Sequence, residues 1–417
     1  MAGQGSSTRF RPQRLRVLVL LVPLLALEIS ALNANQAPRF LLGMAAWYGV
    51  VVLATVITMA VAVALRARTV SLIIGVGPRL DARVVGNRVQ VIRALPLGVS
   101  ARFVPGGAHF GRDFRIISAT GLLCTAGLGA IAALTLPGYA GAVAGAMTAA
   151  VLVLNLAARD PESGRYIVAR VLLPPSPHND PALGKPDRGV AAQARMHLQF
   201  GDFAEAEAVL ATLRSDPGAA CSAALVTAEL FAARGDYDSA ARVRFPQPDP
   251  DEVPALARAR RASDSARIAK LLLLAAEQDP SLAATAVPLA ERHLRSFETV
   301  PVDHTARALY ALLSGDVTTA QRENRICAAR AYMPLGIADA LCSRARLETL
   351  RGRPARAARA LDRAARFAPW YPRIAVVRQI AGAGAAAAIT LLPVSDGASD
   401  TAHVFDEPWS VPTPNEG

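Results

Sequence analysis

The architecture of the N-terminal part of the chain can be inferred from residues 116–158, IISATGLLCTAGLGAIAALTLPGYAGAVAGAMTAAVLVLNLAA. It carries no charged residue over 43 positions, and its one break is Pro137-Gly138. About 20 apolar residues cross a bilayer as a single helix. The stretch therefore predicts two transmembrane helices, over residues 116–136 and 139–158, joined by a tight turn.

Two more apolar segments precede this pair. Residues 40–65 contain no charge, and a segment over residues 15–34 contains a single acid, Glu28. Together these segments predict four transmembrane helices behind a basic tail, residues 1–14. An alternative makes residues 1–37 a cleaved signal peptide, because Arg14 and Arg16 precede an apolar core. No clear A-x-A cleavage site follows that core.

The positive charge follows the apolar segments. The net charge of the 417 residues is +12, and residues 1–158 alone hold 14 arginines and three acids. Residues 159–417 hold the other 31 basic and 30 acidic residues. Apart from Arg39, the arginines of residues 1–158 lie near the N-terminus (Arg9–Arg16) and in 66–115, and further arginines follow residue 158. All of these basic segments lie on one side of the predicted bilayer. Positive flanks face the cytoplasm, so both termini are predicted to be cytoplasmic.

The amino-acid composition indicates where the protein is located and which classes of partner it binds. Alanine and arginine dominate and lysine is scarce, which is typical of a GC-rich bacterial genome, so we expect a multi-pass protein of the bacterial inner membrane. The basic residues form no obvious cluster on a soluble module, and no nucleic-acid partner is predicted. Cys124, Cys221, Cys327 and Cys342 have no metal-binding spacing and are interpreted as free thiols.

Residues 69–98 have the pattern of strands rather than of a helix. The sequence RVVGNRVQVIRAL, residues 83–95, alternates around Gly86-Asn87, which predicts a β-hairpin at the membrane surface. Gly77-Pro78 and the run 96–98 are expected to interrupt it.

Four short motifs around this hairpin resemble the site-2 class of intramembrane zinc metalloproteases. They are GVGPRL (75–80), RALPLG (93–98), RIISATGLLCT (115–125) and NLAARDPESGRY (155–166), in the family's order over residues 50–170. The resemblance implies a three-helix membrane core with a strand segment after its first helix. The residues that match the family's structural positions are Gly75, Gly77, Pro78, Pro96, Leu97, Gly98, Gly121, Asn155 and Gly164.

The catalytic motif of that family is missing. Its H-E-x-x-H sequence binds zinc and activates water, and the matching slot here holds Ala54, Thr55 and Thr58. The family's third ligand falls on Glu162, and His109 is a remote second candidate. The resemblance thus implies a pseudoprotease with no catalytic residue, no metal ligand and no cofactor. Two alternatives stay open: an active protease with zinc at a non-standard site, and a plain membrane anchor.

A linker, residues 173–188, leads into a helical region, residues 189–380, with a recurring turn. The turn is a glycine, usually followed by aspartate, and a small alanine lies five residues after the glycine. The period of 34 to 37 residues resembles tetratricopeptide repeats, which implies four to five helical hairpins that bind a protein or peptide. The repeat-turn residues are Gly201, Asp202, Phe203, Gly235, Asp236, Tyr237, Gly315, Asp316 and Gly352.

The sequence therefore predicts a mainly α protein. Its parts are a four-helix transmembrane domain, residues 15–172, with a small membrane-surface sheet, and a soluble α-solenoid of helical hairpins. Residues 381–417 are expected to be a low-complexity tail. The predicted partners are the lipid bilayer and a cytoplasmic protein, which would contact the first helices of the hairpins near Gln199, Glu229 and Arg234.

Overall fold

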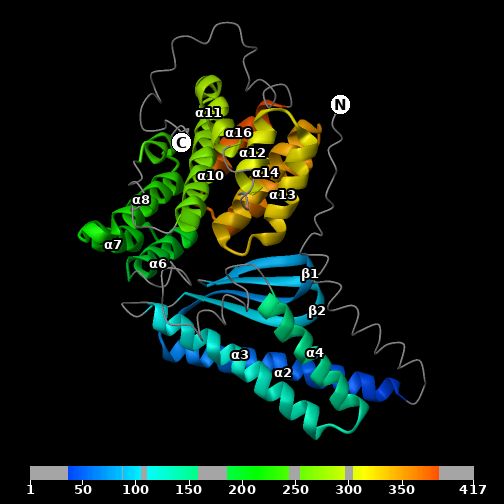
Figure 1. The fold of residues 1–417 in the computed structure, drawn as a ribbon. Coiled ribbons are helices and arrows are strands. Elements are labelled where there is room, and N and C mark those ends of the chain that lie inside the picture. The colour runs from blue at the N-terminus through cyan, green and yellow to red at the C-terminus, as the bar shows by residue number, and fades with distance from the viewer. Residues whose placement is uncertain are drawn as a thin grey trace, which may run out of the picture. The chain divides into compact units, whose positions relative to one another are not determined.

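A computed structural model of the chain describes residues 36–86, 88–104, 110–157, 186–243, 254–295 and 304–384. The fold is mainly helical with one small sheet, which confirms the predicted class at that level. The chain divides into two compact units (Figure 1). The first unit comprises residues 1–69, 73–77 and 93–184, and the second comprises residues 70–72, 78–92 and 185–417.

The described residues of the first unit hold three helices: α2 (Ala37–Ala64), α3 (Phe110–Thr135) and α4 (Tyr139–Ala157). They match the segments predicted over 40–65, 116–136 and 139–158. Helix α3 begins earlier than predicted, since Asp113 in its first turn favours a helix start. The tail and the helix predicted over 15–34 lie outside the described residues.

Two of these helices are long and apolar enough to cross a membrane, α2 over Ala37–Ala64 and α3 over Arg112–Thr135. The apolar part of α4 is shorter, Tyr139–Val153. Large apolar side chains lie on the outside of all three helices. Leu123 and Leu134, for example, are 68% and 86% exposed within the chain. Such exposed apolar surface suits a lipid environment.

Small residues let these helices pack closely. A Cβ atom at Gly43 of α2 would lie 2.6 Å from the carbonyl oxygen of Ala140 in α4. A Cβ atom at Gly129 of α3 would lie 2.8 Å from that of Thr148, also in α4. Trp47 and Met147 are buried beside these contacts. Close backbone approach at small residues is how helices associate in membranes.

The predicted hairpin is confirmed, and it is longer than expected. Strand β1 (Arg68–Val85) and strand β2 (Arg88–Val104) pair in a two-stranded sheet, and Gly86 takes a φ of +57° at the turn. The expected interruptions at Gly77-Pro78 and at 96–98 are wrong, because both strands continue through them. A two-stranded sheet leaves one edge of each strand unpaired, and a proline is tolerated there.

Eleven α-helices of the second unit are described, and they lie in the region predicted to be helical. Helix α6 begins inside the predicted linker, where Pro186 and Asp187 suit a first turn. The rest of the linker, and the tail beyond residue 384, lie outside the described residues. The helices are α6 (Pro186–Phe200), α7 (Phe203–Arg214), α8 (Ala220–Arg234), α9 (Tyr237–Ala241), α10 (Pro254–Gln278), α11 (Ala283–Arg295), α12 (His304–Leu313), α13 (Val317–Arg330), α14 (Pro334–Leu350), α15 (Pro354–Phe367) and α16 (Arg373–Ala383).

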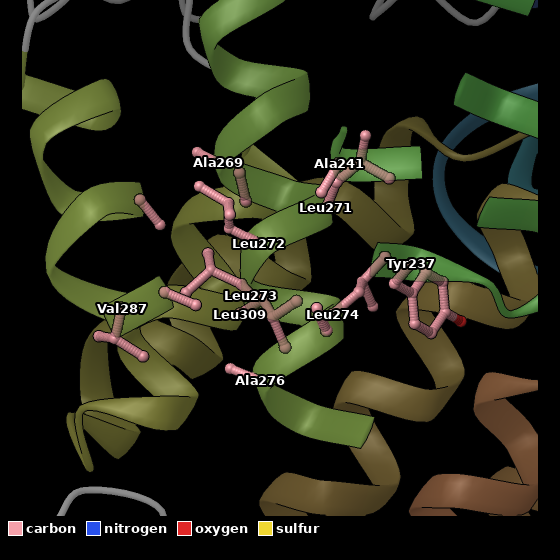
Figure 2. Close-up of a cluster of buried hydrophobic side chains, with 14 of the residues drawn as sticks. Tyr237, Ala241, Ala269, Leu271, Leu272, Leu273, Leu274, Ala276, Val287 and Leu309 are labelled. Carbon is pink, nitrogen blue, oxygen red and sulfur yellow. The ribbon is translucent and has the colours of Figure 1, made fainter. Parts of the chain in front are cut away.

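Consecutive helices pack as pairs from α6–α7 to α14–α15, and α16 packs on the last pair. First helices of neighbouring pairs also touch, as α6 does with α8 and α12 with α14. The largest apolar cluster lies in the middle of this array, where Leu272 and Leu273 of α10 meet Val287 of α11 and Leu309 of α12 (Figure 2). Five consecutive helix pairs are present in the described residues.

Candidate functional site

The motif slot on helix α2, defined as Ala54, Thr55 and Thr58, lies inside the first unit. Ala54 is 3% exposed. The Thr55 hydroxyl lies 2.8 Å from the carbonyl oxygen of Val51 and 3.1 Å from that of Val99 in β2, so it donates its one proton toward two backbone acceptors. The Thr55 side chain thereby joins α2 to the strand that follows the hairpin turn.

The second threonine of the slot faces helix α3. The Thr58 hydroxyl donates to the carbonyl oxygen of Ala54 at 2.7 Å. A Cβ atom at Gly121 of α3 would lie 3.3 Å from the Thr58 oxygen, closer than side chains normally pack. Because Gly121, one of the family-motif positions, has no side chain, the Thr58 side chain fits between α2 and α3.

The residues of the slot do not fit zinc. A catalytic zinc site needs three protein ligands, usually imidazole or carboxylate, and an open position for water. Ala54 has no donor atom, and both threonine hydroxyls are engaged by backbone oxygens. No group of three or more His, Cys, Asp or Glu side chains that could hold a metal ion occurs in the part of the chain that the structure describes. Glu162, His109 and Gly164 lie outside that part.

The other described motif positions lie on strands β1 and β2 and on helix α4. Gly75 is in β1 with a φ of +91°, a value that favours glycine. Positions 77 and 78 follow in the same strand, and positions 96–98 lie in β2 rather than in a turn. Asn155 is in the last turns of α4.

The repeat turns share one backbone conformation. Their φ values are +80° at Gly201, +84° at Gly235, +75° at Gly315 and +67° at Gly352, and each turn joins the two helices of a pair. A left-handed glycine ends many helices because it has no Cβ to clash. The repeat pattern in the sequence therefore marks real helix ends.

Aspartate caps two of the second helices. The Asp236 carboxylate accepts a hydrogen bond from the backbone N–H of Ser239 at 3.0 Å, and that of Asp316 accepts one from Thr319 at 3.0 Å. These bonds satisfy otherwise unpaired helix N–H groups. Asp202 occupies the same position, but it makes no capping bond.

The aromatic residues after the first two turns have different surroundings. Tyr237 is buried in the central apolar cluster (Figure 2). Phe203 packs edge-on against Trp370, with 5.3 Å between the ring centroids. A Cβ atom at Gly201 would lie 2.3 Å from the indole nitrogen of the same Trp370, and one at Gly235 would lie 2.7 Å from Pro372. The loop before α16 therefore packs against the first two repeat turns.

A buried ionic network links the first helices α10 and α14 to helix α16. Arg373 of α16 donates from Nη1 to Asp339 of α14 at 2.7 Å and from Nε to Glu277 of α10 at 2.5 Å. Arg346 of α14 donates to the same Glu277 at 2.8 Å, and Lys270 lies 2.8 Å from Asp339. Both arginines are at most 1% exposed.

The electrostatics of this network keep both acids charged. Burial alone would raise the pKa of Glu277, but Arg373 and Arg346 lower it below its ordinary value. Burial likewise opposes ionisation of Asp339, yet Lys270 and Arg373 hold its pKa well below the ordinary value. Buried charges of this kind are stable only when they are fully paired.

The sequence patterns did not predict this network; they predicted a partner-binding face on the first helices of the pairs. In the structure, side chains on the inner sides of α10, α14 and α16 contact one another. Of the expected contact residues, Glu229 pairs with Arg195 at 2.7 Å and Arg234 pairs with Glu207 at 2.7 Å. The available signal was the placement of Glu277 directly after the apolar run LLLLAA (271–276) and of Asp339 within GIADALC (336–342).

Comparison with known proteins gives no assignment. No family model, no curated protein and no solved structure matches this chain. Its function must therefore be argued from its own residues.

Proposed function

We propose that the chain is an integral membrane pseudoprotease of the site-2 type, which acts as a scaffold and not as a peptidase. Its cytoplasmic helical repeats would dock a protein partner, and its membrane core would hold that partner at the bilayer. The observation that carries the proposal is the motif slot, where the Thr55 and Thr58 hydroxyls donate hydrogen bonds to neighbouring backbone oxygens. The slot has become a packing site between a helix, a strand and a second helix.

Membrane integration is supported by the exposed apolar sides of α2 and α3. A helix of that length in a soluble core would bury most of its surface. The arginine distribution supports a multi-pass arrangement in a bacterial inner membrane with both termini in the cytoplasm. The hairpin favours a protease-like core over a plain anchor, because an anchor needs no paired strands between its helices.

Partner docking is supported by the paired helices and their left-handed glycine turns, which are typical of repeat arrays that bind proteins. The buried network occupies the inner sides of α10, α14 and α16. We therefore place the docking surface on the first two pairs, around the Arg195–Glu229 ion pair.

Metal content tests the pseudoprotease part. The full chain is purified in detergent and its zinc is measured by elemental analysis, beside Glu162→Ala and His109→Ala. We expect less than a tenth of an equivalent in all three proteins. Close to one equivalent in the wild type, lost in either variant, would instead establish a rebuilt metal site and an active protease.

Docking is tested by photo-crosslinking in cells. A photoreactive amino acid replaces Gln199 on α6, and a second protein carries it at Ala358, an exposed position of α15. A discrete crosslinked species from position 199 alone supports docking at the first pairs. The same crosslinked species from both positions would contradict a docking surface that is specific to the first helix pairs.

A further inference from the structure

Helix α15 carries an arginine face, defined as Arg356, Arg359, Arg363 and Arg366 in the sequence PARAARALDRAARF. Spacings of three and four residues place these side chains on one side of a helix. The opposite side is apolar and buried against the rest of the array. Its buried residues are Ala357, Ala360, Leu361, Ala364 and Phe367.

The positive charge of this face is largely uncompensated. Residues 351–367 contain six arginines and one acid, Asp362, which lies 3.7 Å from Arg378. Arg356, Arg359 and Arg366 are exposed, and no carboxylate of the described residues pairs with them. Arg363 lies 3.6 Å from Asp81. Residues 159–417 as a whole are close to neutral, whereas six arginines against one acid give residues 351–367 a net charge of +5.

We propose that the arginine face of α15 binds anionic phospholipid headgroups at the cytoplasmic surface of the bilayer. This rests on the proposed membrane location of the chain. Guanidinium groups bind phosphate through paired hydrogen bonds, and the inner leaflet of a membrane is negatively charged. Arg356 and Arg366 are ten positions apart, which is about 15 Å along the helix, so one face contacts several headgroups at once.

The geometry favours a lipid surface over a nucleic acid. The chain that carries α15 also carries the apolar helices α2 and α3, and residues 158–185 join the two parts. Even a fully extended connection of that length spans at most about 100 Å. The arginine face is thus tethered within reach of a bilayer at all times, which raises its effective concentration there.

The test uses the full chain in a non-ionic detergent. Native mass spectrometry counts bound phosphatidylglycerol and phosphatidylcholine molecules as each lipid is added. One variant combines Arg356→Gln, Arg359→Gln and Arg366→Gln. A matched control combines Arg214→Gln, Arg292→Gln and Arg325→Gln, three exposed arginines on three other helices. Both variants remove the same charge, and circular dichroism checks that both remain folded.

We expect the wild type and the control to bind more phosphatidylglycerol than phosphatidylcholine. The α15 variant should lose that excess, with an apparent affinity for phosphatidylglycerol at least tenfold lower, because each arginine near an anionic surface contributes about fivefold. Equal phosphatidylglycerol binding by the α15 variant and the wild type overturns the proposal.

Two further measurements distinguish lipid binding from nucleic-acid binding and test membrane integration separately. Fluorescence anisotropy with a labelled DNA duplex is run on the same three proteins. DNA binding that is lost in the α15 variant, with lipid binding unchanged, assigns the face to nucleic acid and also overturns the proposal. Alkaline carbonate extraction of cell membranes tests integration separately. Release of the chain would refute the proposed membrane function, while the headgroup preference would still be read from the purified protein.

Discussion

Arg373 binds Glu277 with two of its nitrogens, Nε at 2.5 Å and Nη2 at 3.1 Å, although 96 residues separate them in the sequence. Neither side chain is accessible to water, since both are about 1% exposed. The pair joins α16 to α10 across the inside of the helical array. A planar guanidinium and a carboxylate in this two-point geometry fix the relative position of both helices.

Replacing Arg373 with methionine should destabilise the repeat unit strongly. The change leaves Glu277 and Asp339 buried with fewer partners, which costs about 3–5 kcal/mol. Thermal unfolding in detergent, followed by tryptophan fluorescence, should show a midpoint lower by about 10 °C. The matched control is Arg378→Met on the same helix, where the exposed pair with Asp362 contributes less than about 1 kcal/mol. Equal shifts of the unfolding midpoint for the two variants would mean that the buried network adds no more stability than an exposed ion pair.

His293 should make the stability of the repeat unit depend on pH. Burial, together with the nearby Arg292, lowers the pKa of His293 from 6.5 to about 4. Between these values the unfolded chain binds a proton that the folded chain does not, so stability is lost as the pH falls from 6.5 toward 4. The expected loss is about 3 kcal/mol.

His293→Leu provides the comparison for this pH dependence. Its midpoint of unfolding should change little between pH 7 and pH 4.5, whereas that of the wild type should fall. The acids of the ionic network contribute in a lower window, because their folded pKa values are depressed and their stabilisation is lost only below about pH 4.5. A wild-type curve that is flat above pH 4.5 would contradict the role of His293.

Gly121→Val should separate α3 from α2 at the motif slot. The new side chain would clash with Thr58, and overpacking of this kind costs about 1–3 kcal/mol. Gly127→Val on the same helix is the control, because a Cβ atom there meets nothing within 4 Å. Adding Thr58→Ala to Gly121→Val should recover part of the loss. Without any recovery, the loss would have to arise elsewhere on α3.

Gly201→Ala and Gly315→Ala form a matched pair. Both positions have a left-handed φ, near +80° and +75°, so each alanine costs about 1 kcal/mol in backbone strain. Only at Gly201 does the new methyl group also collide with Trp370. Gly201→Ala should therefore lower the unfolding midpoint more, and Trp370→Ala should remove the difference. Identical midpoints for the two single variants would show that the loop before α16 moves freely.

Restoring the missing motif tests the resemblance to site-2 proteases. The triple variant Ala54→His, Thr55→Glu, Thr58→His places two imidazoles one helical turn apart, and Glu162 would supply a third ligand. Elemental analysis should find about one zinc per chain, and adding Glu162→Ala should reduce it at least tenfold. A folded triple variant without zinc would show that the slot does not correspond to the family's motif.

Local patterns predicted the elements well. The charge-free segments located α2, α3 and α4, and Gly86-Asn87 located the hairpin turn, because hydropathy and turn chemistry act over neighbouring residues. The four repeat glycines were found by their spacing. The expected turn at residues 96–98 failed, since a proline is compatible with the free edge of a two-stranded sheet.

Long-range contacts could not be predicted from such patterns. Glu277 and Arg346 are 69 residues apart, and no periodicity pairs them. The arginine face of α15 was overlooked for another reason, because averaging charge over residues 159–417 gives near neutrality. Only the helical spacing of residues 354–367, considered separately, brings those arginines to one side.

The contact of Pro372 with the Gly235 turn has a consequence for how the chain folds during synthesis. An open repeat array gains stability from neighbouring repeats and can form from its N-terminal end as it leaves the ribosome. Here the turn of the second helix pair packs against Pro372, which is synthesised more than a hundred residues after Gly235. The first pairs therefore emerge before their packing partners exist, and a nascent chain that stalls before α16 would expose them to chaperones and proteases.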